Sequence, residues 1–285
     1  MNIAVVTDSS ACLTAEDCGR WGIEVAPLHV LHDGQDYRVG VDEMPDDLTG
    51  ATTAGASPAE LRAIYRRVLE RDDVDGIVAV HISQQLSGTW VAARNAAKDF
   101  DGAVCVIDSE SVAMGLGFAA IAAADAAARG EDIDAVEAAA VDAAERSSCL
   151  FMVDSLEHLR RGGRVGAAAA LLGTALSIKP VLHVRDGKLV VRDKQRTGTK
   201  ARAKLVDAAV DAAGEAKVDV AVHHFAAAER AETLAERLRE RISNLGEISV
   251  KEADTVLGVH VGPGALGVVV RPYAEETAEL SPGSR

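Results

Sequence analysis

The turn Ser87-Gly88-Thr89 contains the residue types that point most directly to chemistry in this sequence. It lies in the stretch 81–90, HISQQLSGTW, between an apolar run typical of a buried strand and a segment typical of a helix. Such a turn places backbone N–H groups and two hydroxyls at the positively polarised start of a helix. The turn is therefore suited to hold an anion, and a phosphate, a carboxylate or a reacting carbonyl all fit this description.

The other motifs give little support to nucleotide binding or to autonomous catalysis. Segments 115–120 (GLGFAA) and 262–267 (GPGALG) match glycine patterns of dinucleotide-binding proteins, but neither has the strand before it and the helix after it that such a site requires. We interpret them as close helix packing and as a turn between strands. The sequence has no Walker A motif and no G-x-S-x-G elbow, and its histidines are not spaced like a zinc site.

Three further features carry charged or titratable side chains. They are the basic turn RRGGR at 160–164, Arg196 in DKQRTGTK, and His260 in an apolar segment before a glycine turn. Taken alone, a surface turn, a solvated charge and a hydrogen-bonded histidine explain them at least as well as a functional site does.

The elements that position the Ser-Gly-Thr turn follow an α/β pattern. Three short, β-branched runs predict buried parallel strands: NIAVVTD, GIVAVHI and AVCVID. Between the first two, a segment that starts at Ser57-Pro58 has apolar residues on one helical face, namely Leu61, Ile64, Tyr65 and Val68. Ligands of such sheets bind beyond the carboxyl ends of the strands, so we expect the loops 7–10, 83–89 and 108–111 to share one rim.

The pattern of predicted helices and strands changes in the second half of the chain. Two Ala-rich helices at 113–129 and 132–147 precede it, and beyond about residue 150 we predict helices at 199–213 and 226–243 and a helix of small residues at 165–176. The pair Asp186-Gly187 predicts a hairpin, and the end of the chain reads as strands around a glycine turn, followed by a loose tail over 275–285. We therefore predict a parallel-sheet α/β domain over 1–150 and a mixed α+β domain over 151–285.

Composition narrows the possible partners and compartment. The formal net charge of −14 argues against nucleic acid and against anionic membrane surfaces, so any membrane contact is expected to be transient. The four cysteines form no C-x-x-C pair, which fits a reducing compartment. The first residues do not resemble a signal peptide, and no apolar segment reaches about 18 residues, so we expect a cytoplasmic protein.

Together these motifs resemble the DegV family across essentially the whole chain. The segments that carry the resemblance are VVTDSSACLT, IEVAPLHV, ISQQLSGTW, VIDSESVAMGLG, DSLEHLRRGGR, LLGTALSIKPVL, DGKL and GVHVGPGALGVVV. The resemblance implies a Rossmann-like domain joined to a mixed α+β domain, with a long-chain fatty acid bound between them. It also implies a non-catalytic component that presents the carboxylate to a separate fatty acid kinase subunit, which makes acyl phosphate for phospholipid synthesis.

The same resemblance implies a set of fatty-acid-binding residues and no cofactor. They are Thr53, Ser87, Gly88, Arg196 and His260, while the acyl chain would occupy an apolar tunnel. The loop 53–57 reads TAGAS where the family has Thr-Ser-Gln-Pro-Ser, so we expect a looser loop at Thr53. An enzyme that uses the same hydroxyl rim on a small carboxylated or phosphorylated substrate remains the alternative, and so does a ligand-responsive interaction protein.

Overall fold

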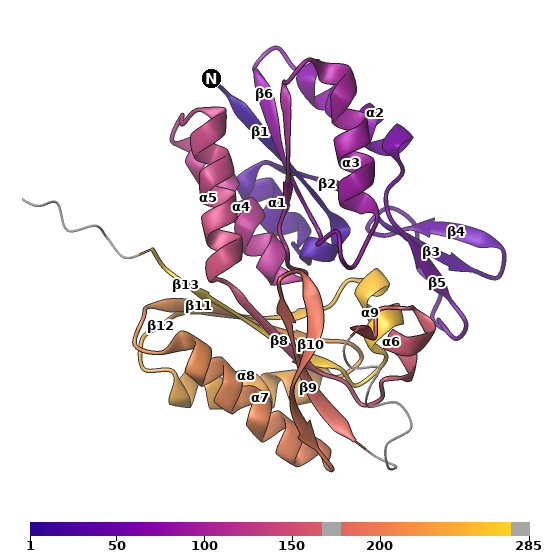
Figure 1. The fold of residues 1–285 in the computed structure, drawn as a ribbon, viewed down its shortest axis with the longest axis vertical. Helices are drawn as coiled ribbons and strands as arrows, with labels where there is room; N and C mark the ends of the chain where they lie inside the picture. Colours follow the sequence, from indigo (N-terminus) through magenta and orange to yellow (C-terminus); the bar gives the residue numbers. More distant parts are fainter. Residues whose placement is uncertain (167–177, 275–285) are drawn as a thin grey trace, which may run out of the picture.

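The computed structural model describes residues 1–166 and 178–274. The first half is built on a parallel sheet, as predicted, and the order of its strands is β2-β1-β6-β7 (Figure 1). Its strands are β1 (Ile3–Asp8), β2 (Ile23–Ala26), β6 (Gly76–His81) and β7 (Val104–Asp108). The mixed α/β fold predicted from the sequence is confirmed.

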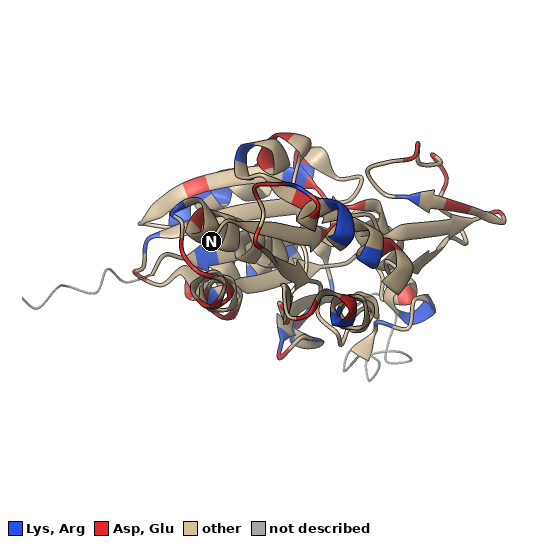
Figure 2. Ribbon diagram, turned by 90° about the horizontal axis from the view of Figure 1, so that it is seen from above, with Lys and Arg blue, Asp and Glu red and all other residues tan. Residues whose placement is uncertain are grey.

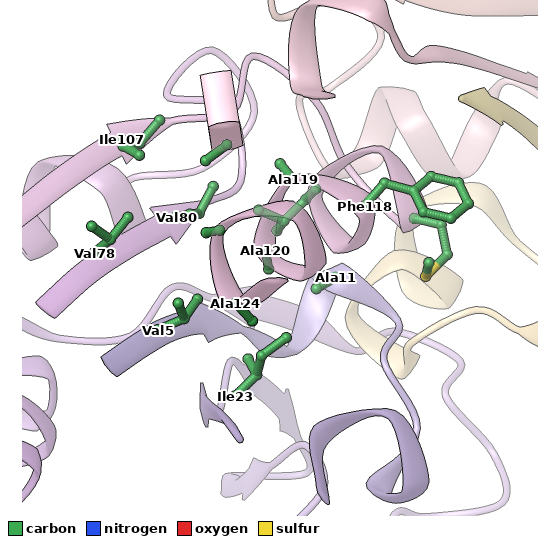
Figure 3. Close-up of a cluster of buried hydrophobic side chains, with 14 of the residues drawn as sticks. Val5, Ala11, Ile23, Val78, Val80, Ile107, Phe118, Ala119, Ala120 and Ala124 are labelled. Atoms are coloured by element: carbon green, nitrogen blue, oxygen red, sulfur yellow. The ribbon is translucent and has the colours of Figure 1, made fainter. Parts of the chain in front are cut away.

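Both faces of this sheet are covered by helices, which explains why its strands are apolar throughout. Helices α4 (Met114–Ala128) and α5 (Ile133–Arg146) pack on one face, and α2 (Pro58–Leu69) and α3 (Thr89–Ala97) on the other (Figure 1). Alternate residues of each strand point to opposite faces. Figure 3 shows this on the α4 side, where Val5, Val78 and Val80 meet Ala119, Ala120 and Ala124.

Helix α2 begins where the sequence predicts. Ser57 and Glu60 form a capping box, in which each side chain accepts a hydrogen bond from the backbone N–H of the other, and Pro58 occupies the first helical position. The four apolar residues predicted to share one face, Leu61, Ile64, Tyr65 and Val68, are all buried.

The glycines of GLGFAA lie inside α4 and serve close packing. A Cβ at Gly115 would come 2.0 Å from Ser111 Oγ, and one at Gly117 would come 2.7 Å from the backbone oxygen of Ala11. Both glycines therefore let α4 approach its neighbours. The rejection of this segment as a nucleotide-binding motif is consistent with its position inside the helix.

A small antiparallel sheet, which the sequence analysis did not predict, projects beside the parallel sheet (Figure 1). Its order is β4-β3-β5, and its strands are β3 (His29–His32), β4 (Gln35–Arg38) and β5 (Thr52–Ala54). Strand β5 carries Thr53. Short helices complete this half of the chain: η1 (Ser9–Ala11), α1 (Ala15–Trp21) and η2 (Lys98–Phe100).

The second half is built on a mixed six-stranded sheet with the order β10-β9-β8-β13-β11-β12. Its strands are β8 (Ser148–Met152), β9 (Lys179–Arg185), β10 (Lys188–Gln195), β11 (Val218–His224), β12 (Leu245–Glu252) and β13 (Leu266–Pro272). Helices α7 (Gly198–Ala213) and α8 (Ala228–Arg241) cover one face (Figure 1). The opposite face contributes Cys149, Ala221 and Val269 to the buried cluster around α4.

The two halves therefore share buried side chains as well as having cores of their own. Strand β8 spans residue 150 and lies entirely in the second sheet. The division into domains at that residue stays a prediction. The predicted helix at 165–176 and the tail over 275–285 lie almost wholly outside the described residues. Among the described helices, none has the length and apolar character needed to cross a bilayer.

One prediction for the second half is wrong. Residues 255–261 form helix α9 (Thr255–Val261) where the sequence analysis expected a strand. The β-branched residues there favour a strand, but the Asp254 side chain accepts hydrogen bonds from the N–H groups of Val256 and Leu257 and so starts a helix. The remaining short helix, α6 (Glu157–Arg161), lies beside α9 (Figure 1).

The hairpin at Asp186-Gly187 is confirmed and reaches the first half of the chain. Both turn residues have positive φ, 49° and 72°, as a two-residue turn with the twist of the flanking strands requires. The backbone oxygen of Gly187 accepts a hydrogen bond of 2.9 Å from Ser83 Oγ. The hairpin therefore contacts the loop that leads to Ser87.

We expect Gly187→Ala to lower the free energy of unfolding more than Gly34→Ala does. Both glycines follow an aspartate in a two-residue turn and have a φ of 72° and 76°, so both substitutions cause backbone strain of about 1–2 kcal/mol. A Cβ at Gly187 would also come 2.4 Å from Ser83 Oγ, whereas one at Gly34 meets nothing within 4 Å. Urea unfolding should show about 1–3 kcal/mol more loss for Gly187→Ala. Equal losses would contradict the hairpin contact.

Candidate ligand-binding site

An apolar cavity lies between the two halves of the chain. It encloses about 1000 Å³ of space outside the protein atoms, part of it open to solvent. Strands β8 and β13 form one wall, and the loops after β2, β6 and β7 contribute on the other side. Most of the lining is hydrophobic and includes Leu28, Leu86, Leu159, Leu189, Phe225 and Leu266. A cavity of this size and character is typical of a site for a mainly apolar ligand.

Thr53 and His260 meet at one part of the lining, although 207 residues separate them in the sequence. Thr53 Oγ1 lies 2.7 Å from His260 Nε2 and shares a hydrogen bond with it. Burial, reinforced by the charge of the neighbouring Arg164, lowers the pKa of His260 to about 4. The imidazole is therefore neutral at pH 7. Its Nδ1 atom is buried and has no hydrogen-bond partner among the described residues.

Ser87 also lines the cavity and is held by the first residue of α3. Its Oγ lies 2.8 Å from Thr89 Oγ1 and accepts a hydrogen bond of 3.3 Å from the Thr89 backbone N–H. Thr89 is fully buried. The Ser-Gly-Thr turn therefore fixes the Ser87 hydroxyl at the wall of the cavity, and Thr89 is a positioning residue that the sequence analysis did not identify.

The loop TAGAS packs directly against this turn. A Cβ at Gly55 would come 2.6 Å from Thr89 Oγ1 and 3.2 Å from Ser87 Oγ, so only glycine allows the observed approach. Ala56 is buried in the core beneath the loop. The expectation of a looser loop does not agree with this packing, because Gly55 lies directly against Thr89 and Ser87 and leaves no room for a side chain.

Arg164, the last residue of RRGGR, lines the same part of the cavity. Its Nε donates a hydrogen bond of 3.0 Å to the backbone oxygen of Leu86, and its Nη1 donates one of 2.5 Å to the backbone oxygen of Gly162. The sequence analysis left the role of this basic turn open. The structure shows that it joins α6 to the loop of Ser87 and places a cation next to His260.

The structure brings together three of the five residues predicted for the site. Thr53, Ser87 and His260 line the cavity. Gly88 precedes α3 and does not line the cavity, so any contribution would come from its backbone. Arg196 follows β10, is exposed and does not belong to the lining. Its assignment stays a prediction that the cavity geometry does not support.

Hydrogen bonds hold the hydroxyl-rich loops together at the rim of the parallel sheet, next to the site. Asp8 Oδ2 accepts hydrogen bonds from the Ile82 N–H, at 2.9 Å, and from His81 Nδ1, at 3.0 Å. The Ser83 N–H donates to the backbone oxygen of Ser111. Asp8 thus joins the loop 7–10 to the end of β6, and Ser83 joins the loop 83–89 to the loop 108–111.

This arrangement suits an elongated apolar ligand with one anionic end. The apolar lining would hold the chain, while hydroxyls, a neutral imidazole and a guanidinium are donors that a carboxylate prefers. Within residues 1–166 and 178–274, no group of three or more His, Cys, Asp or Glu side chains is placed to hold a metal ion.

The fold and the cavity define the class to which the protein belongs, an α/β protein with a ligand site between two sheets. A family model described as "Uncharacterised protein, DegV family" matches residues 2–273. The chain therefore belongs to the DegV family.

Relatives of known sequence and structure agree with this assignment. A DegV domain-containing protein of Mycobacterium tuberculosis is 47% identical over 272 residues, which cover 95% of this chain and 97% of that protein. A DegV family protein from Thermus thermophilus, described as fatty acid binding, has 32% identity and a TM-score of 0.89 over 96% of this chain and 100% of its own. DegV from Bacillus subtilis, described as a fatty acid binding protein, has 30% identity and a TM-score of 0.87 over the same shares.

Proposed function

We propose that this protein binds a long-chain fatty acid in the cavity and presents its carboxylate to a separate kinase subunit. The observation that carries the first part is the meeting of Thr53, Ser87, Arg164 and His260 at one part of an otherwise apolar lining. Two solved relatives with 30% identity or more are described as fatty acid binding, which supports the same ligand class.

Physical chemistry explains why such a site would select an acyl chain. Each buried methylene group contributes about 0.8 kcal/mol, so a long chain supplies most of the binding free energy. A carboxylate that leaves water needs compensating hydrogen bonds, and each charge-assisted bond contributes about 1.5–3 kcal/mol. The Thr53 and Ser87 hydroxyls and an N–H of His260 can donate them, and Arg164 adds a positive charge.

A second hollow supports the presenting role. A surface groove shares Thr53, Arg164, Phe225 and His260 with the apolar cavity. It extends outward between the segment 46–52 on one side and His158 and Arg161 on the other, so both signs of charge face it. A carboxylate held at the shared residues would be reachable from this groove. The groove is therefore the surface where we place the kinase subunit that brings ATP.

The distribution of charged residues also bears on the kind of partner. Figure 2 shows Lys and Arg interspersed with Asp and Glu over the face in view. With a net charge of −14, this distribution favours a protein partner over a polyanion. A cytoplasmic location and a place in phospholipid synthesis belong to the same proposal, since acyl phosphate is an activated acyl donor.

One contact favours the alternative of an enzyme. The 2.7 Å hydrogen bond between Thr53 and His260 resembles the contact of a hydroxyl nucleophile with its base. A working triad also needs an acceptor that orients the base, and His260 Nδ1 has no partner among the described residues. We therefore assign this pair to ligand binding.

We expect Ser87→Ala to weaken the binding of a fluorescent C16–C18 fatty acid by about tenfold or more, because one hydrogen bond to a charged group is lost. Titration of the delipidated protein measures the effect. Ser249→Ala is the matched control, since Ser249 is a half-buried serine of β12 outside the cavity lining. The affinity of this variant for the probe should stay within about twofold of the wild-type value. The assignment of Ser87 would be wrong if both variants bound the probe like the wild type.

The presenting role predicts that fatty-acid-loaded protein and ATP form acyl phosphate only when a fatty acid kinase catalytic subunit is added. Trapping with hydroxylamine as the hydroxamate measures the product. Arg161→Ala should lower the rate without changing fatty-acid affinity, because Arg161 lines the groove and not the cavity. Product formation without the subunit would support the enzyme alternative instead.

A further inference from the structure

Helix α9 presents His260 to the cavity, and Asp254 starts this helix. Asp254 Oδ1 accepts a hydrogen bond of 2.6 Å from the Val256 N–H and a weaker one of 3.4 Å from the Leu257 N–H. Helix α9 has only seven residues. So short a helix has little stability of its own and depends on its cap and on its packing.

The position of α9 affects the cavity directly. Val256, Leu257, His260 and Val261 all line it. Val256 is also part of the core beside β6 and packs among residues from the first half of the chain, whereas α9 belongs to the second half. The helix also packs against β3 and β5, so it sets the distance between His260 and Thr53.

Asp254 contacts the loop after β1, the segment TDSS that lines no cavity itself. Its backbone N–H donates to Cys12 Sγ at 3.5 Å, and the Ser9 side chain opposes the rise in the pKa of its carboxyl group. Ser9 Oγ in turn accepts a hydrogen bond of 3.2 Å from the N–H of Leu28, which lines the cavity. Asp254 thus joins the start of α9 to the rim of the parallel sheet.

Burial of the Asp254 carboxylate is energetically unfavourable. Asp254 Oδ2 is buried and has no hydrogen-bond partner among the described residues. Burial, together with a smaller contribution from the charge of the nearby Asp8, raises the pKa of Asp254 to about 6, against the lowering effect of the Ser9 side chain and of the Val256 and Leu257 N–H groups. A buried carboxylate with one unpaired oxygen costs free energy, so general stability alone does not explain an aspartate at this position.

We propose that Asp254 is a positioning residue for fatty-acid binding, which acts by holding α9 so that His260 faces the carboxylate beside Thr53. Asp254 does not touch the ligand, because it lies outside the cavity lining. The inference rests on the proposed fatty-acid site and adds the residue that fixes its histidine.

The test compares Asp254→Ala with Asp254→Asn in the full-length protein, with a fluorescent C16–C18 fatty acid as the probe. Asparagine is as good a helix cap as aspartate, whereas alanine removes the acceptor. We expect about fivefold to tenfold weaker binding for Asp254→Ala and an affinity within about twofold of the wild type for Asp254→Asn. A thermal unfolding curve that spans the assay temperature establishes that each variant is folded when it is titrated.

Two further variants separate positioning from a loss of stability. Asp132 caps α5 through a hydrogen bond of 3.0 Å from the Ala135 N–H and lies outside the cavity, so Asp132→Ala should leave the affinity unchanged. In a His260→Ala background, Asp254→Ala should change the affinity by less than about twofold, because the group that it positions is already absent.

The outcomes distinguish this inference from the function on which it rests. If the wild type fails to bind the probe, the proposed fatty-acid site is wrong. If the wild type binds, the inference about Asp254 is overturned by any of three results: unchanged affinity in Asp254→Ala, failure of Asp254→Asn to restore binding, or a full additional loss in the His260→Ala background.

Discussion

The hydrogen bond between Thr53 and His260 is the contact on which the architecture of this site depends. It joins β5 of the small antiparallel sheet to α9, two elements that the chain reaches 207 residues apart. For the two side chains to meet, β5 must project from the first half, and α9 must leave the second half and pack into the core beside β6. The close approach of Gly55 and the cap at Asp254 both serve this meeting.

The same contact explains how one protein can combine an apolar cavity with polar chemistry. Burial keeps His260 neutral, and Arg164 reinforces this effect through its charge. A neutral imidazole can donate one hydrogen bond and accept another, so it serves an anionic head group without adding a second buried charge. The positive charge comes from Arg164, which is itself tied to the loop of Ser87 through the backbone of Leu86.

The sequence predicts the regular parts of this fold well. The two-sided burial of the strands and the helix start at Ser57-Pro58 are local patterns, and the structure confirms both. The Asp186-Gly187 turn is also a local pattern, because it needs only two residues with positive φ. Helix α9 was missed because its β-branched residues favour a strand, and the cap at Asp254 overrides that preference. The small sheet of β3, β4 and β5 was missed because its strands have only three or four residues each.

The candidate site was predictable only in part. Ser87, Thr53 and His260 were named on the family resemblance, and the structure brings them to one cavity. The roles of Thr89, Gly55 and Arg164 depend on distances between segments that no local pattern encodes. Arg196 was named on the family resemblance, but it follows β10, is exposed and does not line the cavity.

The most direct test of the central claim is to denature the purified protein, extract it with organic solvent and quantify fatty acids by mass spectrometry. We expect close to one long-chain fatty acid per protein molecule, either as purified or after incubation with C16–C18 acids and gel filtration. A protein that carries no fatty acid as purified and retains none after incubation would contradict it.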